Sequence, residues 1–333
     1  MSDALLKIRD LRTSFRISGQ YYAAVDGIDL DIYKDEVFAL VGESGCGKSA
    51  TALSITNLHN PNFTKVEGTV EFGGKNLLQL TEKELNKVRG HDIGMIFQDP
   101  LSALNPLMKV GAQIEESLTI HTDLTAAGRK ARAIELLEAV GMTNPPLTYR
   151  MLPHELSGGM RQRVVIAIAL SCNPSFVIAD EPTTALDVTI QAQILDLLRD
   201  LQKQFNTSVL LITHDLGVVA EMADRVAVMY GGQIVEYAGV HELFSNPMHP
   251  YTRSLLASIP NVDEIADQLH VIQGMVPPLN LMPRKGCRFG SRTPWMPAEC
   301  HEEEPVLREV SPNHHVLCTC YKTFHFDDEK GAN

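Results

Sequence analysis

The sequence predicts an α/β fold built on a mostly parallel sheet with helices on its faces. Short apolar runs typical of buried strands occur in the segments EVFALV, DIGMIFQ, SFVIADE and SVLLITHD. Helix-compatible segments separate these runs, and strands that alternate with helices usually form a parallel sheet. From about residue 110 to 170 the apolar residues recur about every 3.6 positions, which indicates a helical subdomain inserted into that core.

The pattern changes near Ser258, where a segment rich in proline, glycine and polar residues begins. This composition predicts a linker with little regular structure. We therefore expect one large domain over residues 1–258 and a small irregular C-terminal extension over residues 259–333. The sequence contains no internal repeat, so we expect a single copy of the large domain.

The composition limits the classes of function. The 333 residues include 29 basic and 41 acidic side chains, a formal net charge of −12, which disfavours a broad nucleic-acid-binding surface. No apolar run approaches the roughly 18 to 20 residues that cross a bilayer, and the N-terminus lacks the features of a secretory signal. The six cysteines do not resemble a secreted disulfide framework. We therefore expect a cytosolic chain whose role at a membrane would depend on partners.

The segment GESGCGKS, Gly42–Ser49, matches the phosphate-binding loop pattern G-x-x-x-x-G-K-[ST] between a strand and a helix. Glycines allow the backbone N–H groups to turn inward and surround phosphate oxygens at a helix N-terminus. Lys48 supplies a positive charge to the outer phosphates, and Ser49 offers a hydroxyl to Mg²⁺. The candidate nucleotide-contacting residues are Gly42, Glu43, Ser44, Gly45, Cys46, Gly47, Lys48, Ser49 and Ala50.

Two adjacent carboxylates, Asp180 and Glu181, follow the apolar strand segment FVIA. Acidic residues at the end of a strand are often only solvated, and it is their pairing with the phosphate loop that indicates a shared site. We expect Asp180 to hold Mg²⁺, directly or through water. We expect Glu181 to orient and polarise the water that attacks the γ-phosphate.

Between these two motifs lies LSGGMRQR, Leu156–Arg163, followed by the helical run VVIAIAL. This octapeptide closely resembles the signature of the ATP-binding-cassette (ABC) ATPases. The resemblance implies a P-loop NTPase cassette with a RecA-like mixed sheet core, an antiparallel β subdomain and the inserted helical subdomain, with ATP and Mg²⁺ as ligands. It also implies that Ser157, Gly158 and Gly159 face the γ-phosphate of ATP bound by an opposite subunit, so that a complete site needs two cassettes.

Further positions match elements of this family. Gln98, in FQDP, corresponds to the glutamine that contacts Mg²⁺ and the attacking water. Asp187 ends the element ALD, which crosses the dimer interface in the family, and His214, in LITHD, matches the histidine that contacts the γ-phosphate. Phe15 aligns best with the aromatic residue that stacks on adenine, with Tyr22 as the alternative.

Cys46 lies inside the phosphate loop, directly before a helix. A helix N-terminus can lower the pKa of a thiol and so make it reactive. We therefore expect alkylating agents to inhibit ATP hydrolysis and bound ATP to protect the protein. The simpler interpretation is a tolerated small residue.

Two segments narrow the resemblance within the family, namely FQDPLSALNPLMKVGAQI and HELFSNPMHPYTRSLLASIP. Both resemble the ATPases of oligopeptide/dipeptide and nickel importers. The resemblance implies a peripheral protein on the cytoplasmic face of the cell membrane that hydrolyses ATP to power import of oligopeptides or dipeptides. It implies as partners a second, paralogous ABC ATPase, two transmembrane permeases and an extracytoplasmic peptide-binding lipoprotein, and no nucleic acid. Residues 99–113 are expected to form the groove that binds a permease coupling helix.

The same motifs are compatible with two alternative functions. A nickel importer ATPase would have the same segments, and an ABC ATPase of DNA repair or translation would need no membrane partner. Proteins of the latter kind usually have two cassettes, long insertions or basic surfaces, whereas this chain has one cassette, a short helical subdomain and an acidic balance. The sequence therefore favours peptide transport, and it leaves open which peptides are carried and whether the two cassettes are identical.

The C-terminal extension contains four of the six cysteines. Many ATPases of peptide importers end with a four-cysteine pattern associated with an iron–sulfur cluster. Cys287, Cys300 and Cys318 stand at positions of that pattern, whereas Thr293 stands where its remaining cysteine is expected. A neutral hydroxyl is a poor substitute for a thiolate, and such clusters are ordinarily held by four cysteines.

Three interpretations of the extension follow. In the first, Cys320 replaces the missing ligand of an iron–sulfur or zinc site. The ligands would then be Cys287, Cys300, Cys318 and Cys320. In the second, His314 or His315 completes a zinc site of three thiolates and one imidazole. The missing thiolate favours the third, a metal-free extension that folds by packing, with Trp295 in its core.

Overall fold

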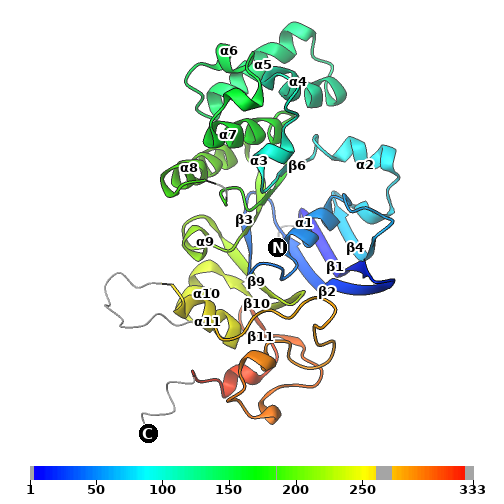
Figure 1. The fold of residues 1–333 in the computed structure, drawn as a ribbon, viewed down its shortest axis with the longest axis vertical. Helices are drawn as coiled ribbons and strands as arrows, with labels where there is room; N and C mark the ends of the chain where they lie inside the picture. The colour runs from blue at the N-terminus through cyan, green and yellow to red at the C-terminus, as the bar shows by residue number, and fades with distance from the viewer. Residues whose placement is uncertain (1–3, 185, 260–271, 327–333) are drawn as a thin grey trace.

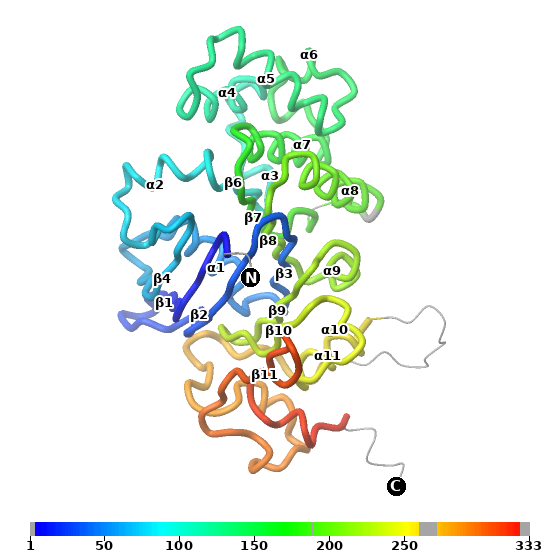
Figure 2. The backbone as a smooth tube through the Cα atoms, turned by 180° about the vertical axis from the view of Figure 1, so that it is seen from behind, coloured from blue at the N-terminus to red at the C-terminus, as the bar shows by residue number. Residues whose placement is uncertain are grey.

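The computed structural model describes residues 4–184, 186–259 and 272–326 (Figure 1). Its central sheet has eight strands. In spatial order they are β11 (Leu307–Ser311), β12 (His314–Leu317), β10 (Gln233–Gly239), β9 (Arg225–Tyr230), β3 (Val37–Val41), β8 (Ser208–Thr213), β7 (Phe176–Asp180) and β6 (Ile93–Ile96). Both views place the helical subdomain and the C-terminal extension at opposite ends of the molecule (Figures 1 and 2).

The five strands β9, β3, β8, β7 and β6 run parallel, as the alternation of strands and helices predicted. Strands β3, β7 and β8 are buried along their whole length because elements cover both faces of the sheet. The helices that follow the parallel strands or close the domain are α1 (Lys48–Ile55), α8 (Val188–Phe205), α9 (Leu216–Met222), α10 (Val240–Ser245) and α11 (Pro250–Ala257). Parallel strands end at one edge of the sheet, so the loops that follow them meet there.

A second sheet is antiparallel and has four strands, in the order β2 (Gln20–Ile32), β1 (Leu6–Ile17), β4 (Thr64–Phe72) and β5 (Lys75–Asn76). It confirms the antiparallel β subdomain. Apolar side chains such as Leu6 and Ile8 alternate into a core shared with Phe38 and Leu40 of the central sheet. The short helix α2 (Glu82–Val88) follows this sheet. Strands β1 and β2 of this subdomain contact α1, the helix that follows the phosphate loop.

The helical subdomain also agrees with the prediction. Its helices are α3 (Pro100–Ala103), α4 (Val110–His121), α5 (Ala126–Ala139), α6 (Pro145–Thr148) and α7 (Gly158–Ala169). Their apolar faces share one core with the underside of α8 and with strands β6, β7 and β8. The last helix, α7, begins at the signature motif, so the packing of this subdomain fixes where that motif lies.

The C-terminal extension is less irregular than predicted. Its described residues, 259 and 272–326, contain three short 3₁₀ helices, η3 (Gly290–Arg292), η4 (Ala298–Cys300) and η5 (Cys320–Lys322), but also the hairpin of β11 and β12. Strand β12 pairs antiparallel with β10, with Val316 opposite Glu236 and His315 opposite Tyr237. The hairpin covers β10, which would otherwise present unpaired backbone groups at the sheet edge. The extension is therefore continuous with the cassette sheet.

Aromatic packing also ties the extension to the cassette. Phe289 of the extension is 2% exposed, and its ring lies 5.3 Å from that of Tyr230 and 5.4 Å from that of Tyr251. Burial of a side chain of this size contributes about 1.5–3 kcal/mol. Trp295, which we expected in the core of the extension, is only half-buried, and its Nε1 donates to the carbonyl of His325. Phe289 therefore occupies the packing role that the sequence suggested for Trp295.

Candidate nucleotide-binding site

The phosphate loop joins β3 to α1 and packs closely against neighbouring backbone. Gly47 has a φ of 113°, and a Cβ there would lie 2.5 Å from the carbonyl oxygen of Ala24. A Cβ at Gly42 would lie 2.2 Å from the carbonyl oxygen of Met229. Only glycine fits these two positions, because any side chain would collide with backbone atoms that cannot move away. Close packing thus explains Gly42 and Gly47, whereas a Cβ at Gly45 would meet open space, and glycine is favoured there by its left-handed φ of 79°.

Lys48 lies on the first turn of α1 and is buried. Its Nζ donates to the carbonyl oxygens of Gly42 and Glu43, at 2.8 and 3.1 Å. The same Nζ lies 3.8 Å from Oε1 of Glu181. The ammonium group is therefore held over the loop, between backbone carbonyls and a carboxylate.

Ser49 and Asp180 bring together two oxygen groups of the kind that Mg²⁺ prefers. Ser49 Oγ donates to Asp180 Oδ1 at 3.0 Å. Burial raises the pKa of Asp180, and the hydrogen bond from Ser49 opposes this shift. A hydroxyl and a carboxylate in contact, at the edge of a phosphate loop, form a donor set that fits a partly hydrated Mg²⁺ ion. Two of the three predicted Mg²⁺ ligands thus lie in contact, and the third, Gln98, donates to Glu181.

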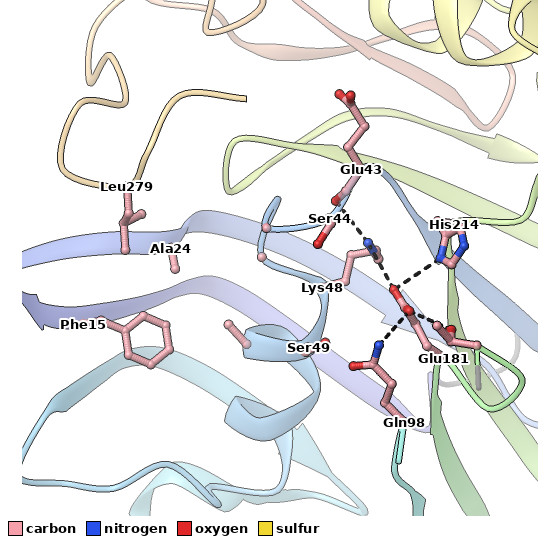
Figure 3. A pocket seen from close by; sticks show the side chains of 14 residues that line it. Phe15, Ala24, Glu43, Ser44, Lys48, Ser49, Gln98, Glu181, His214 and Leu279 are labelled. Atoms are coloured by element: carbon pink, nitrogen blue, oxygen red, sulfur yellow. Dashed lines mark hydrogen bonds and ion pairs between the residues drawn. The ribbon is translucent and has the colours of Figure 1, made fainter. Parts of the chain in front are cut away.

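Glu181 follows β7 and is the centre of the site (Figure 3). Gln98 Nε2 and Thr184 Oγ1 both donate to its Oε2, at 3.0 and 2.8 Å. His214 Nδ1 lies 3.5 Å from the other oxygen, Oε1. Three side chains predicted separately from sequence, Gln98, Glu181 and His214, therefore meet at one carboxylate.

The backbone of Glu181 is unusual. Its φ of 46° lies in the left-handed region, which a residue other than glycine adopts only at a cost of about 1–3 kcal/mol. Its N–H donates to the carbonyl of Ile212 in β8 at 2.9 Å, which holds the turn. The conformation turns the carboxylate away from the sheet and towards the loop after β3. Strain of this kind concentrates at functional sites.

A cavity of about 750 Å³ opens beside these groups. Ligand cavities usually measure about 300–1,000 Å³, so it can hold a nucleotide. Its lining residues are Phe15, Ala24, Glu43, Ser44, Gly45, Gly47, Lys48, Ser49, Ala50, Gln98, Glu181, Thr184, His214 and Leu279. Phe15 is part of this lining and Tyr22 is not, which favours Phe15 as the adenine-stacking residue. Figure 3 shows Phe15, Ala24 and Leu279 on the side away from Glu181.

Cys46 does not behave as expected. The side chain is 1% exposed and belongs to the apolar core between the two sheets. Burial raises the pKa of the thiol, and the nearby charge of Lys48 only partly offsets this. The expected lowering of the pKa is wrong, because the side chain points behind the loop into the core. Among the nucleotide-contacting candidates, Gly42 and Cys46 support the loop from behind and do not line the cavity.

The signature motif lies away from this cavity. Ser157 caps α7, with its Oγ accepting from the backbone N–H of Met160 at 3.4 Å, and Gly158 and Gly159 form the first turn. Ser157 and Gly158 are exposed. Asp187 caps α8 in the same way, accepting from the N–H of Ile190 at 3.0 Å. Their contact with a second subunit stays a prediction, and Ala185 of the same element lies outside the described residues.

Residues of the C-terminal extension reach the site, and sequence reasoning missed all of them. Leu279 lines the cavity, and Arg292 forms an ion pair with Glu43 of the phosphate loop. The backbone N–H of Glu43 also donates to the hydroxyl of Tyr251, which lies on α11 of the large domain, at 2.8 Å. Thr184, which donates to Glu181, was not identified from the sequence either. Its position three residues after Glu181 could have indicated this contact. The extension thus supports the loop that binds phosphate.

The cysteines of the extension only partly follow the predicted grouping. Cys287, Cys318 and Cys320 come together, and the fourth member of the group is His301. The four candidate ligand atoms lie within 4.8 Å of one another. Cys300 is not in this group, because the 3₁₀ turn η4 ends at it and directs the next residue towards the thiols. The predicted ligand set of Cys287, Cys300, Cys318 and Cys320 is therefore wrong, because His301 takes the place of Cys300.

The histidines proposed from sequence as zinc ligands have other partners. His314 is completely buried, with its Nε2 2.8 Å from Glu236 and its Nδ1 3.2 Å from Glu242. The ring of His315 packs against that of Tyr237 at 5.5 Å. Side chains alternate along β12, so these neighbours point to opposite faces of the sheet. Neither belongs to the group formed by the three thiols and His301.

Comparison with known proteins gives two family matches. Residues 25–184 match the family described as ABC transporter, and residues 235–300 match the oligopeptide/dipeptide transporter C-terminal region. Among the described residues, no helix combines the length and the apolar composition needed to span a bilayer. The second match extends into the segment that contains Cys287 and Cys300.

Curated relatives match almost the whole chain. The oligopeptide transport ATP-binding protein OppD of Lactococcus lactis subsp. cremoris (strain SK11) is 49% identical over 330 residues, which cover 99% of this chain and 98% of that protein. The corresponding protein AppD of Bacillus subtilis (strain 168) is 50% identical over 330 residues, covering 98% of both. The dipeptide transport ATP-binding protein DppD of the same organism is 46% identical over 317 residues, covering 95% of both.

Solved structures match the cassette. A dimeric post-hydrolysis state of the ATP-binding cassette MJ0796, bound to ADP and Pi, has a TM-score of 0.63 and 29% identity, and the match covers 71% of this chain and 98% of that one. The protein cbiO1 from Clostridium perfringens, part of the ABC transporter complex cbiONQ, has a TM-score of 0.62 and 28% identity, covering 74% and 92%.

Proposed function

Because the chain belongs to the ABC transporter family and, within it, to the oligopeptide transport ATP-binding proteins, we propose that it hydrolyses ATP to power the import of oligopeptides or dipeptides. The observation that supports this most directly is the convergence of Gln98, Lys48 and His214 on the carboxylate of Glu181, beside a cavity of nucleotide size.

Binding of the triphosphate uses the loop between β3 and α1. Its N–H groups surround phosphate oxygens at the N-terminus of α1, and Lys48 neutralises charge on the outer phosphates. Ser49 and Asp180 would hold Mg²⁺, which would supply Lewis-acid stabilisation of the charge that develops on the triphosphate. Phe15 stacks on the adenine, with Ala24 and Leu279 forming the rest of that apolar end of the cavity.

Hydrolysis needs a water molecule aligned with the γ-phosphorus. Gln98 and Thr184 hold Oε2 of Glu181, which keeps Oε1 directed towards Lys48 and His214. Oε1 accepts a proton from the attacking water, the new P–O bond forms, and the bond between the γ-phosphorus and the bridging oxygen breaks to give ADP and phosphate. His214 contacts the γ-phosphate and is half exposed at the cavity mouth.

A complete site requires a second cassette. Ser157 and Gly158 at the start of α7, and Asp187 at the start of α8, are exposed and lie outside the cavity of their own chain. The N-terminus of α7 offers N–H groups and a hydroxyl to a phosphate, and the helix dipole favours negative charge there. We assign this surface to the γ-phosphate of ATP bound by a paralogous sister cassette.

Transport requires membrane partners, namely two permeases that receive peptide from an extracytoplasmic binding lipoprotein, with the cassettes on the cytoplasmic face. Residues 99–113, directly after Gln98, are assigned to the permease contact. Two apolar side chains in this segment are strongly exposed, Leu101 at 61% and Leu107 at 88%. Exposed apolar residues beside a catalytic glutamine fit a surface that is covered by another protein.

The test is reconstitution of the chain with its permeases, sister cassette and binding protein in proteoliposomes. We expect ATP-dependent uptake of labelled oligopeptides or dipeptides, and ATPase activity that rises when peptide-loaded binding protein is added. Uptake of nickel without uptake of peptide would assign the chain to the alternative importers. ATPase activity that rises with DNA or ribosomes, and not with permeases, would overturn the transport assignment.

A further inference from the structure

Three thiols and one imidazole meet in the C-terminal extension. Cys287 precedes η3, His301 follows η4, and Cys318 and Cys320 follow strand β12. Cys318 and Cys320 are 1% and 0% exposed. The four candidate ligand atoms lie within 4.8 Å of one another. In the part of the chain that the structure describes, this group is separate from the residues that line the nucleotide-sized cavity.

An iron–sulfur cluster does not fit these residues. The family pattern places cysteines at positions 287, 293, 300 and 318, but position 293 is a threonine and Cys300 lies outside the group. Such clusters ordinarily need four thiolates, and only three thiols face one another here. The imidazole of His301 occupies the remaining place.

We propose that Cys287, Cys318, Cys320 and His301 bind a structural Zn²⁺ ion. A closed set of three thiolates and one imidazole is one of the standard tetrahedral zinc sites. With Zn–S bonds of about 2.3 Å, the sulfur atoms of a tetrahedron lie about 3.8 Å apart. The observed limit of 4.8 Å therefore requires the sulfur atoms to approach one another by about 1 Å at most, which rotations about the χ angles can supply.

The surroundings of His301 favour this assignment. Its Nδ1 is buried and has no hydrogen-bond partner, and its Nε2 lies 3.4 Å from Oγ1 of Thr293. Thr293 Oγ1 in turn donates to the carbonyl of Gly290 at 3.2 Å. The hydroxyl can therefore accept a hydrogen bond from Nε2–H, which leaves the lone pair of Nδ1 for a metal. Thr293 is thus a supporting residue of the histidine ligand, and not simply a lost cysteine.

A backbone group supports one of the thiolates as well. The N–H of Glu302, next to His301, donates to Sγ of Cys318 at 3.4 Å. Cys318 itself has a φ of 67°, in the left-handed region, so the end of β12 turns sharply and places both Cys318 and Cys320 on the same side. A hydrogen bond from a backbone N–H stabilises the negative charge of a metal-bound thiolate.

The site would hold together segments with little regular structure. Cys287 and His301 belong to irregular chain, whereas Cys318 and Cys320 follow a strand of the central sheet. A metal ion that joins them would fix the segment containing Arg288 and Arg292, which form ion pairs with Asp26 of β2 and with Glu43 of the phosphate loop. Zinc would therefore stabilise the support of the phosphate loop without taking part in ATP chemistry.

The experiment is metal analysis of the full-length protein after purification from zinc-supplemented cells. We expect about one zinc per chain, little iron and no visible iron–sulfur absorbance. Cobalt exchanged for zinc should give the absorption bands of a tetrahedral thiolate site. Cys320→Ser should lose the zinc, whereas the matched control Cys300→Ser should keep it. Thr293→Val should bind zinc about 10- to 100-fold more weakly in chelator competition.

A further readout uses the unaltered chain, in case Cys320→Ser does not fold. Zinc should protect three thiols from modification, and a chelator should expose them while zinc restores protection. Stoichiometric iron with sulfide, metal-free protein with fully reactive thiols, or equal zinc in Cys320→Ser and Cys300→Ser would each overturn the proposal. Loss of zinc in Cys300→Ser with retention in Cys320→Ser would overturn the ligand set.

Discussion

Glu43 of the phosphate loop and Arg292 of the C-terminal extension form an ion pair although they lie 249 positions apart in sequence. Arg292 is 4% exposed and also donates to the carbonyl oxygens of Gln273 and Gly274, at 2.7 and 3.2 Å. The guanidinium therefore links three segments at one point beside the cavity. This link makes the extension part of the nucleotide site.

Removal of this guanidinium should disturb both stability and nucleotide binding. We expect Arg292→Ala to lower the free energy of unfolding by about 1–3 kcal/mol, below the range for fully buried pairs because Glu43 is partly exposed. ATP affinity should fall several-fold. Arg199→Ala, which breaks an exposed pair with Glu221, is the control and should cost less than about 1 kcal/mol. Urea unfolding and nucleotide titration measure the two effects, and equal losses in both variants would contradict this role.

Substitution of the central carboxylate should separate binding from hydrolysis. Glu181→Gln keeps the shape and the oxygen that accepts from Gln98 and Thr184, but it cannot accept a proton from water. We expect phosphate release to slow by about 10²- to 10⁴-fold while ATP still binds. Thr184→Val keeps the charge and removes one hydrogen bond, so its loss should be smaller. Full ATPase activity in Glu181→Gln would mean that another group accepts the proton from the attacking water.

The buried thiol of the phosphate loop should resist modification. Burial raises the pKa of Cys46, and its Sγ lies in the apolar core, so alkylating reagents should not label it in the native protein. Peptide mass analysis should find it labelled only after unfolding. The partly exposed Cys172 provides the comparison within the same sample. Rapid native labelling of Cys46 that ATP prevents would instead restore the original expectation.

Local motifs predicted most of the nucleotide site. The phosphate loop, the carboxylates after β7 and the histidine after β8 were each identified from a strand followed by a few residues of defined chemistry. Parallel strands bring such strand ends together at one edge, so the topology converts separate motifs into one site. For this reason Gln98 and His214 both lie beside Glu181, and the catalytic roles of all three stay predictions.

Contacts that depend on the path of irregular chain could not be predicted. Arg292 and Leu279 reach the cavity from the extension, whose course follows from the packing of Phe289 and the hairpin of β11 and β12. His301 was missed because it adjoins Cys300, which matched the family pattern. The structure groups His301 with the thiols and leaves Cys300 out, and no periodicity in the sequence shows which of two neighbouring residues faces a cluster.

The buried pair of His314 and Glu236 should make stability depend on pH. Burial lowers the pKa of His314, but its hydrogen bonds with Glu236 and Glu242 outweigh this, so the net pKa is raised. The pair therefore contributes its full stability below the unfolded pKa of about 6.5 and loses it as pH rises through the folded pKa.

We accordingly expect the urea midpoint of the zinc-replete protein to fall from about pH 6.5 upwards. His314→Asn should be less stable at low pH and should show a flatter profile. His241→Asn, at an exposed position on α10, is the matched control and should keep the profile of the unaltered chain. Identical profiles for the unaltered chain and His314→Asn would contradict the assignment.

The choice between Phe15 and Tyr22 can be settled by affinity. Phe15 lines the cavity with Ala24 and Leu279, whereas the hydroxyl of Tyr22 donates to Gln20 at 2.9 Å, outside the lining. Stacking of a base on an aromatic side chain contributes about 1–3 kcal/mol, so Phe15→Ala should weaken ATP binding about 5- to 150-fold and Tyr22→Ala should not. Inorganic triphosphate has no base to stack, so its affinity should be the same in both variants. A loss for triphosphate equal to that for ATP would mean that Phe15 supports the loop and does not contact adenine.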